Sequence, residues 1–279
     1  MVEQTRSDPT IGKELSPHPF RVTDTMVQDY QEGLTLDYDS AGPLPSMLAG
    51  WADSFHEAAR FTQDKGHLWM RQEWELRAPL VKDDDYLAHA VIKDIYRRRD
   101  RTVVNTAMDL KNSADETVVK SWHHQSFLLD APVEMVQFRD PNKKEGARKF
   151  IVPEGAPLDE IDKVIDLEMC GQFFHGNKNY HTDLQASQEL GFHDVVVGGH
   201  MSMSCMGRLM EQHFGASWWT GGKLDIKFTN PLWPDDHIRI RGVATGPAED
   251  DASRDAVFAW IEKGDGTIVL IANASAPND

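Results

Sequence analysis

Three side chains in the second half of the sequence, His175, His181 and His200, are suited to proton transfer near neutral pH. His181 is the candidate for the principal acid/base, because it stands in the polar run Asn179-Tyr-His-Thr-Asp183. His200 follows two glycines and could serve as a second proton-transfer group. His175 could approach the same pocket, and Asn177 could orient a water molecule without deprotonating it. Each of them could instead be a hydrogen-bonded structural residue or an ordinary loop residue.

Gly198 and Gly199 precede a helical pattern and could let a ligand carbonyl approach the backbone closely. N–H groups at the start of a helix lack helical acceptors, and the positive end of the helix favours a developing oxyanion. Tyr180 and Met201 are the neighbours that we expect to bind the same substrate. In the alternative interpretation, the glycines only permit a tight strand-to-helix turn and Met201 belongs to the core.

The composition excludes several classes of partner. The 279 residues carry a formal net charge of −16, which repels nucleic acid and anionic lipid. No apolar run approaches the roughly 18 residues needed to span a bilayer, and the N-terminal residues hold no signal-peptide core. Cys170 and Cys205 offer neither a disulfide framework nor a metal set. We therefore expect a cytoplasmic protein with no metal or other cofactor, no nucleic-acid partner and no membrane partner.

The elements that must position these residues follow an α+β pattern in each half. Alternating apolar residues predict strands near 69–78, 85–97, 101–112 and 116–129, and again near 222–229, 236–245, 254–262 and 267–275. Helical spacing predicts helices around 26–30, 45–60, 158–173 and 200–214. Asp265-Gly266 predicts a hairpin between the last two strands. A long helix followed by antiparallel strands is typical of a helix wrapped by a curved sheet.

The order of elements repeats between the halves. The pairs Pro79-Leu80 and Pro231-Leu232 precede similar alternating runs and lie 152 residues apart, which indicates duplication of a small domain. The polar stretch Asp140–Gly146 is the best boundary between them. We predict an N-terminal arm over 1–18, a first domain over 19–138, a connector over 139–149 and a second domain over 150–279. Basic residues around the connector could bind an anionic group or could form a solvated linker.

Two stretches of the second half resemble motifs of the MaoC-like (R)-specific enoyl-CoA hydratases and dehydratases. The run Lys227-Phe-Thr-Asn-Pro-Leu-Trp-Pro-Asp-Asp-His-Ile238 is similar to the F-x-x-P-x-x-P-G-D-x-L run of that family. Residues 179–186, followed by Gly191-Phe192 and Val195–Met201, are similar to its N-P-x-H-x-D … A … G-F … H-G-M stretch. Residues 72–79 are similar to the non-catalytic repeat of two-domain members. The resemblance covers roughly residues 20–275 and implies a tandem, or double, hotdog fold.

The resemblance also implies a reaction. Members of the family add water to an α,β-unsaturated acyl thioester, or remove it from a 3-hydroxyacyl thioester, and coenzyme A is the favoured carrier. They use an Asp and a His five residues apart, together with N–H groups at the start of the hotdog helix. His181 matches the family histidine, but Gly176 stands at the position of the carboxylate and Gly199-His200 replaces the family His-Gly. Catalysis with one proton-transfer group should be slower by about 10² or more.

Other functions of the same fold stay open. A thioesterase would need a carboxylate at the helix start, where the sequence offers no clear Asp or Glu. A non-catalytic subunit that binds acyl thioesters or a partner would explain Gly176. The aromatic side chains Trp218, Trp219 and Trp233 could line an acyl tunnel or could serve in packing. We expect one open pocket on the second-half side, bounded partly by the first half, and we leave open whether two chains form a homodimer.

Overall fold

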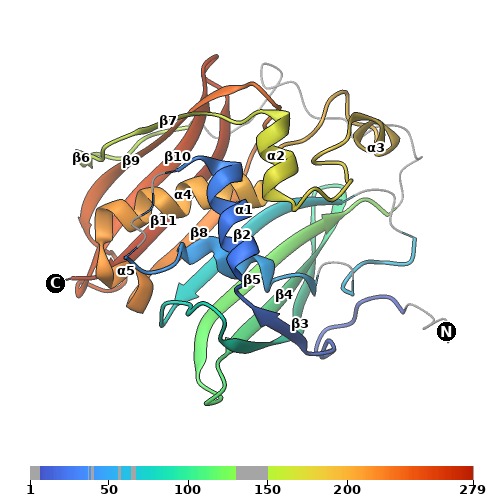
Figure 1. The fold of residues 1–279 in the computed structure, drawn as a ribbon, viewed down its shortest axis with the longest axis horizontal. Helices are drawn as coiled ribbons and strands as arrows, with labels where there is room; N and C mark the ends of the chain where they lie inside the picture. Colours follow the sequence, from blue (N-terminus) through green and yellow to red (C-terminus); the bar gives the residue numbers. More distant parts are fainter. Residues whose placement is uncertain are drawn as a thin grey trace.

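A computed structural model describes residues 7–36, 38, 41–55, 58–63, 67–129 and 150–278 of the chain. Its strands form one antiparallel sheet (Figure 1), in the order β1-β3-β4-β5-β2-β8-β11-β10-β9-β6, with β7 also paired to β9. The α+β class expected from the sequence is confirmed. The predicted connector over 139–149 lies outside the described residues, as do residues 1–6 of the arm and residues 130–138 of the predicted first domain.

The first-half strands alternate between buried and exposed residues, as the sequence predicted. In β3, for example, Tyr86, Ala88 and Ala90 are buried while Leu87 and His89 between them are exposed. Four strands have bounds close to those predicted: β2 His67–Leu76, β3 Asp85–Arg98, β4 Arg101–Lys111 and β5 Thr117–Phe127. The short strand β1, His18–Arg21, was not predicted.

Four strands of the second half also follow the predicted pattern: β8 Lys223–Phe228, β9 His237–Pro247, β10 Arg254–Lys263 and β11 Ile268–Pro277. The short strands β6 Ala156–Pro157 and β7 Ile161–Val164 were not predicted. The predicted hairpin at Asp265-Gly266 is confirmed: the Lys263 N–H donates to the Thr267 carbonyl over 2.8 Å, and Gly266 has a φ of 85°.

The two halves share one plan, which supports a duplication. Asp83 and Asp235, 152 residues apart, both have left-handed backbone, with φ of 65° and 66°. The N–H of Asp83 donates to the Val22 carbonyl and the N–H of Asp235 to the Ile165 carbonyl, each over 2.9 Å. Strand β1 pairs with β3 as β7 pairs with β9. The two Pro-Leu pairs fall at matching positions, just after β2 and just after β8.

The halves are joined through the antiparallel pairing of β2 with β8. Across this seam Arg71 makes a bidentate ion pair with Asp225, with Nε 2.7 Å from Oδ1 and Nη2 2.9 Å from Oδ2. The hydrogen bonds to Asp225 raise the pKa of the Arg71 guanidinium. The seam therefore combines backbone and charged side-chain contacts, and it makes one continuous sheet from the two units.

The central helix is α4, which packs against β9, β10 and β11 (Figure 1). Most residues of α4 are buried, among them the apolar Met201, Met203, Met206, Leu209 and Met210. The helix predicted at 200–214 is thus confirmed. The helix predicted at 158–173 is wrong over its first part, because residues 161–164 pair with β9 instead. The bounds are α1 Asp24–Leu34, α2 Leu167–Phe173, α3 Leu184–Glu189, α4 Gly199–Phe214 and α5 Ala216–Gly221.

The helix predicted at 45–60 is wrong. Among the described residues of this range, the chain forms only a 3-10 helix, η1, at Ser46–Trp51. Pro45 and Gly50 disfavour a longer helix here, and α4 occupies the adjoining space. A Cβ on Gly50 would overlap the His200 ring, and a Cβ on Gly207 would overlap the Met47 side chain. Within the described residues, therefore, only the second half has the long helix that both halves were expected to contain.

The described part of the arm pairs with the first half. The N–H groups of Gly12 and Leu15 donate to the carbonyls of Ile92 and Ala90, over 2.8 and 2.9 Å. Residues 12–15 therefore extend the β1 edge of the sheet along β3. Along the parts of the chain that the structure describes, no helix combines the length and the apolar character needed to cross a bilayer.

Candidate functional site

The start of α4 is formed by backbone alone. Gly198 is the N-cap residue and makes no side-chain cap, and no acidic residue lies in the first turn. The N–H groups of Gly199 and His200 belong to that first turn, so they have no acceptor within the helix. These N–H groups and the positive end of the helix suit an oxygen atom that carries negative charge.

Aromatic rings lie against both glycines. A Cβ on Gly198 would be 2.5 Å from Cζ of Phe174 and 3.8 Å from Cγ of His181. A Cβ on Gly199 would be 2.9 Å from Cε3 of Trp69, which comes from β2 of the first half. Any side chain here would displace these rings, which is a physical reason for glycine. The structure thus brings His181, Gly198 and Gly199 together, as the sequence predicted.

His181 is held in one orientation by its loop. Its N–H donates to Asn179 Oδ1, and its Nδ1 donates to the Val196 carbonyl, both over 2.7 Å. Because a carbonyl can only accept, Nδ1 carries the hydrogen and the lone pair of the neutral ring is on Nε2. The ring stacks on Phe174 with 5.0 Å between centroids, and Tyr180 lies beside it at 3.8 Å. This tautomer suits a base that acts through Nε2.

His200 is buried between the halves. Its Nε2 donates to the Met47 carbonyl of η1 over 2.8 Å. The rings of Trp51 and Phe173 lie 4.7 and 5.1 Å from its ring. Burial lowers the pKa of His200 to about 4, so the ring is neutral at physiological pH. These contacts indicate that His200 joins α4 to η1, and they weigh against the second proton-transfer role considered from the sequence.

His175 is paired with a carboxylate that the sequence analysis did not identify. Its Nδ1 donates to Oδ2 of Asp29 on α1, and Gln172 Nε2 donates to the other oxygen of Asp29 over 2.5 Å. Asp29 is buried, whereas the His175 side chain is 29% exposed. The Trp51 ring lies 5.1 Å from the His175 ring. An Asp–His pair therefore lies beside the aromatic residues of the helix start.

The other predicted site residues have different environments. Asn177 is exposed, and its backbone carbonyl accepts from Thr182 Oγ1 over 2.7 Å. The loop thus uses the backbone of Asn177, and no described contact assigns its side chain to a water. Tyr180 is half-buried beside His181, and Met201 is wholly buried in the core. Asp183 caps α3, where its Oδ1 accepts from the Ala186 N–H over 2.9 Å.

Comparison with solved structures shows which fold this is. A MaoC-like dehydratase from Phytophthora capsici has a TM-score of 0.71 at 14% identity, covering 96% of this chain and 97% of its own. A conserved hypothetical protein of Mycobacterium tuberculosis with a double hotdog fold has a TM-score of 0.62 at 13% identity, covering 96% of both chains. The chain described here has the double hotdog fold. Full-length peroxisomal multifunctional enzyme type 2 from Drosophila melanogaster has a TM-score of 0.69 at 14% identity, with 94% of this chain matching 48% of that one. No protein-family model matches the sequence, and no curated protein matches it.

The double hotdog explains which site residues the sequence analysis missed. Asp29 and Trp51 belong to the first half, and they meet His175 only because α1 packs against α2 and η1 packs against α4. Trp69 reaches Gly199 from β2 in the same way. No spacing in the sequence links these residues to the second-half motif. An aspartate on a predicted helix and two tryptophans in apolar patterns gave no signal of function.

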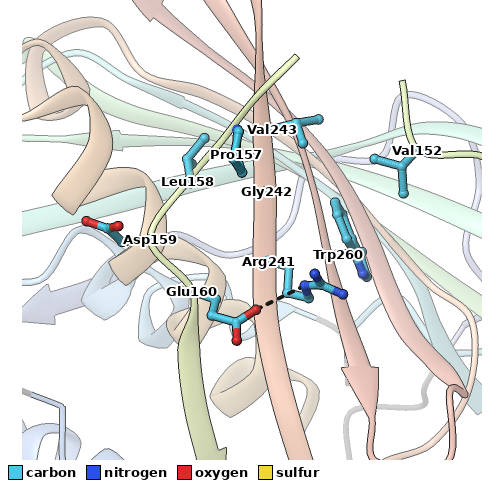
Figure 2. Close-up of a pocket in the computed structure, with 9 residues that line it drawn as sticks. All are labelled: Val152, Pro157, Leu158, Asp159, Glu160, Arg241, Gly242, Val243 and Trp260. Carbon is cyan, nitrogen blue, oxygen red and sulfur yellow. Dashed lines mark ion pairs between the residues drawn. The ribbon is translucent and has the colours of Figure 1, made fainter. Parts of the chain in front are cut away.

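A hollow in the second half lies away from the start of α4. It has a volume of about 530 Å³ and is lined by residues of 152–160, β9 and β10 (Figure 2). Arg241 Nε is 3.1 Å from Glu160 Oε2 at its edge, and the Trp260 ring forms part of its wall. Its lining includes neither first-half residues nor any predicted site residue. It is therefore not the pocket that we expected.

Four other histidines and tryptophans of the described residues have structural contacts. His123 stacks on Trp69, whereas His124 contacts Glu73 and Tyr96, so the two neighbours face opposite sides of β5. The Nε1 groups of Trp218 and Trp219 donate to Ser46 Oγ and to the Leu44 carbonyl. These tryptophans join α5 to the first half. No three His, Cys, Asp or Glu side chains among the described residues gather closely enough to hold a metal ion.

Proposed function

We propose that this protein is a hydratase or dehydratase of acyl thioesters, acting on an enoyl thioester or on its 3-hydroxyacyl product, with coenzyme A as the carrier. The observation that carries the proposal is the position of His181 at the start of α4. Its Cγ lies 3.8 Å from where a Cβ on Gly198 would be, and its Nδ1 hydrogen bond leaves the lone pair on Nε2. A base and a set of backbone donors therefore meet at one point.

This geometry supports a specific first step. The thioester oxygen would accept from the N–H groups of Gly199 and His200. His181 Nε2 takes a proton from water as the water oxygen forms a bond to C3 of the substrate. The electron pair of the C2–C3 double bond then moves toward the thioester, and the negative charge on its oxygen is stabilised by the helix start. A proton added at C2 completes the 3-hydroxyacyl thioester.

The proposal is tested by replacing His181 with Ala and following hydration of a short enoyl-CoA by its ultraviolet absorbance. We expect kcat to fall by about 10² or more with a smaller change in KM, because the side chain acts on the transition state. His213→Ala, at the exposed far end of α4, is the matched control and should keep wild-type turnover. Absence of water addition to any enoyl thioester by the wild-type protein would overturn the proposal.

Binding of an acyl thioester without turnover is the second candidate. This candidate is favoured by Gly176, which has a φ of 68°. Gly176 has no side chain at the position where the MaoC-like hydratases, which the sequence resembles, have their catalytic carboxylate. A thioesterase is less well supported, because the first turn of α4 contains no acidic residue. Isothermal titration with a non-reactive saturated acyl-CoA separates the two candidates, since binding together with absent hydration would establish the second.

A further inference from the structure

We propose that His175 is the second proton-transfer group of this site and that Asp29, from the first half of the chain, is the residue that positions it. The inference rests on the proposed hydratase function and identifies the proton donor that Gly176 cannot supply. The juxtaposition that carries it is an Asp–His pair built from both halves of the double hotdog, beside the start of α4.

The contacts of Asp29 fix the ring of His175. One carboxylate oxygen accepts from His175 Nδ1 and the other accepts from Gln172 Nε2 over 2.5 Å. The Asp29 side chain is 12% exposed and that of His175 is 29% exposed. The carboxylate is therefore enclosed while the ring keeps an accessible edge. A carboxylate at Nδ1 orients an imidazole and stabilises the positive charge that the ring carries when Nε2 is also protonated.

The pair lies next to the helix start. Trp51 contacts His175 with 5.1 Å between ring centroids, and it contacts His200 of α4 at 4.7 Å. Trp51 also meets Phe174 edge-on at 5.8 Å, and Phe174 is the ring on which His181 stacks. These ring contacts place His175 close to the first turn of α4.

The backbone of His175 is unusual for a residue with a side chain. α2 ends with two left-handed residues in succession, His175 with φ of 57° and Gly176 with φ of 68°. Glycine would adopt the first of these without strain, whereas a residue with a Cβ is strained there. Glycine does occupy the next left-handed position, Gly176, but not position 175. A requirement for the imidazole side chain would account for a histidine at this strained position.

The hydrogen-bond partners of His181 and His175 suit the two rings to different proton-transfer roles. His181 Nδ1 faces a carbonyl, so its neutral form has a lone pair on Nε2 and acts as the base toward water. His175 Nδ1 donates to a carboxylate, which orients the ring so that Nε2 is the atom that gives a proton to C2. Water thus supplies the hydroxyl at C3, and the proton taken by His181 is balanced by the proton lost from His175. Both rings return to their starting states by exchange with solvent.

A purely structural pair would link α1 to α2 and do nothing else, and chemical rescue distinguishes the two cases. His175→Gly suits the positive φ, so this variant should keep its melting temperature within a few degrees of the wild type. We expect kcat to fall by about 10² and to recover at least tenfold when free imidazole is added. Imidazole should not restore His181→Ala to the same extent, because that ring is packed between Phe174 and Tyr180.

Asp29 is tested by a mutant cycle. Asp29→Asn should lower kcat with little change in KM, and it should cause no further loss in the His175→Gly background. Gln28→Ala, at the exposed position next to Asp29 on α1, is the matched control, whose kcat should stay near that of the wild type. If His181→Ala lowers turnover while His175→Gly does not, or if imidazole gives no recovery, this inference is overturned and the hydratase proposal stands. If wild-type protein hydrates no enoyl thioester, both fall.

Discussion

At the scale of single residues, hydrogen-bond partners give three histidines different chemistry. His181 donates through Nδ1 to a carbonyl, His175 donates through Nδ1 to a carboxylate, and His200 donates through Nε2 to a carbonyl inside the core. The first pattern suits a base and the second suits an acid. The third, with a pKa of about 4, suits a neutral structural ring. Residue type alone could not have separated these functions.

The glycine at the N-cap of α4 gives a residue-scale prediction. Gly198→Ala would place a Cβ 2.5 Å from Cζ of Phe174, so the ring must move, and His181 stacks on that ring. We expect kcat for enoyl-CoA hydration to fall by about 10- to 100-fold, because a displacement of roughly 1 Å can cost that much. Steady-state kinetics with parallel thermal melts measure the effect.

Gly171→Ala is the matched control for that substitution. A Cβ there meets nothing within 4 Å, and Gly171 lies inside α2. Alanine should therefore leave kcat unchanged and stabilise the helix by up to about 1 kcal/mol. Equal kinetic effects of the two alanines would contradict the close packing at Gly198.

At the scale of elements, the loop between α2 and α3 carries His175, Gly176 and His181, so the helices on either side set its geometry. Both helices are short and both begin with an aspartate cap: Asp166 accepts from the Met169 N–H over 2.7 Å, and Asp183 accepts from the Ala186 N–H. Short helices depend on such caps, because few internal hydrogen bonds hold them.

The cap of α2 gives the prediction at this scale. Asp166→Ala removes the acceptor of the Met169 N–H and should lower the free energy of unfolding by about 1 kcal/mol, measured by urea denaturation. Asp166→Asn keeps an oxygen at the same position and should recover most of the loss. A variant with Asn that is as unstable as the Ala variant would show that charge, and not the hydrogen bond, matters here.

At the scale of the whole molecule, a buried carboxylate joins the two halves. Glu211 of α4 accepts hydrogen bonds from the N–H and Oγ of Ser46 in η1, both over 2.7 Å. Arg208 Nη1 lies 3.7 Å from its other oxygen. Burial raises the pKa of Glu211 from its ordinary 4.5 to about 7, and the Ser46 hydrogen bonds only partly oppose this. The contact between the halves therefore depends on the protonation of one side chain.

The raised pKa makes stability depend on pH in a defined direction. Between about pH 4.5 and pH 7 the folded protein retains a proton on Glu211 that the unfolded chain has released, so rising pH favours unfolding. The contribution of protonated Glu211 to the free energy of unfolding is fully present below about pH 4.5 and is lost as the pH rises through about 7. It amounts to about 3 kcal/mol. Gln cannot ionise, so the Glu211→Gln variant does not lose this contribution. Its free energy of unfolding, measured by urea denaturation and taken relative to that of the wild type, should therefore be higher at about pH 8 than at about pH 5.

The control for this measurement is Glu249→Gln, at an exposed position, whose difference from the wild type should not change with pH. His200 contributes with the opposite sign: because its pKa is lowered to about 4, its stabilising effect is lost as pH falls from its ordinary 6.5 toward 4. The two effects offset each other in the wild type, so Glu211→Gln should also steepen the loss of stability in acid. A pH-independent difference between Glu211→Gln and the wild type would show that Glu211 is not desolvated.

The sequence by itself determined the four long strands of each half, the central helix and the repeat. Alternation along β3 and β9 follows from the period of a pleated strand, and the 152-residue offset of the Pro-Leu pairs reappears in the matching backbone of Asp83 and Asp235. It also brought His181, Gly198 and Gly199 into one candidate site, because all three lie in a single motif of one half. These inferences depend on local periodicity and on spacing within one unit.

Only the tertiary structure decided what the other half contributes. The predicted helix at 45–60 gave way to η1, because α4 and its His200 ring fill the space beside Gly50. Residues 161–164 became a strand because β9 offers an edge to pair with. The pairing of Asp29 with His175 across 146 residues depends on α1 packing against α2. Contacts between distant segments are set by the packing of whole elements, and periodicity within a segment carries no information about which distant side chain it will meet.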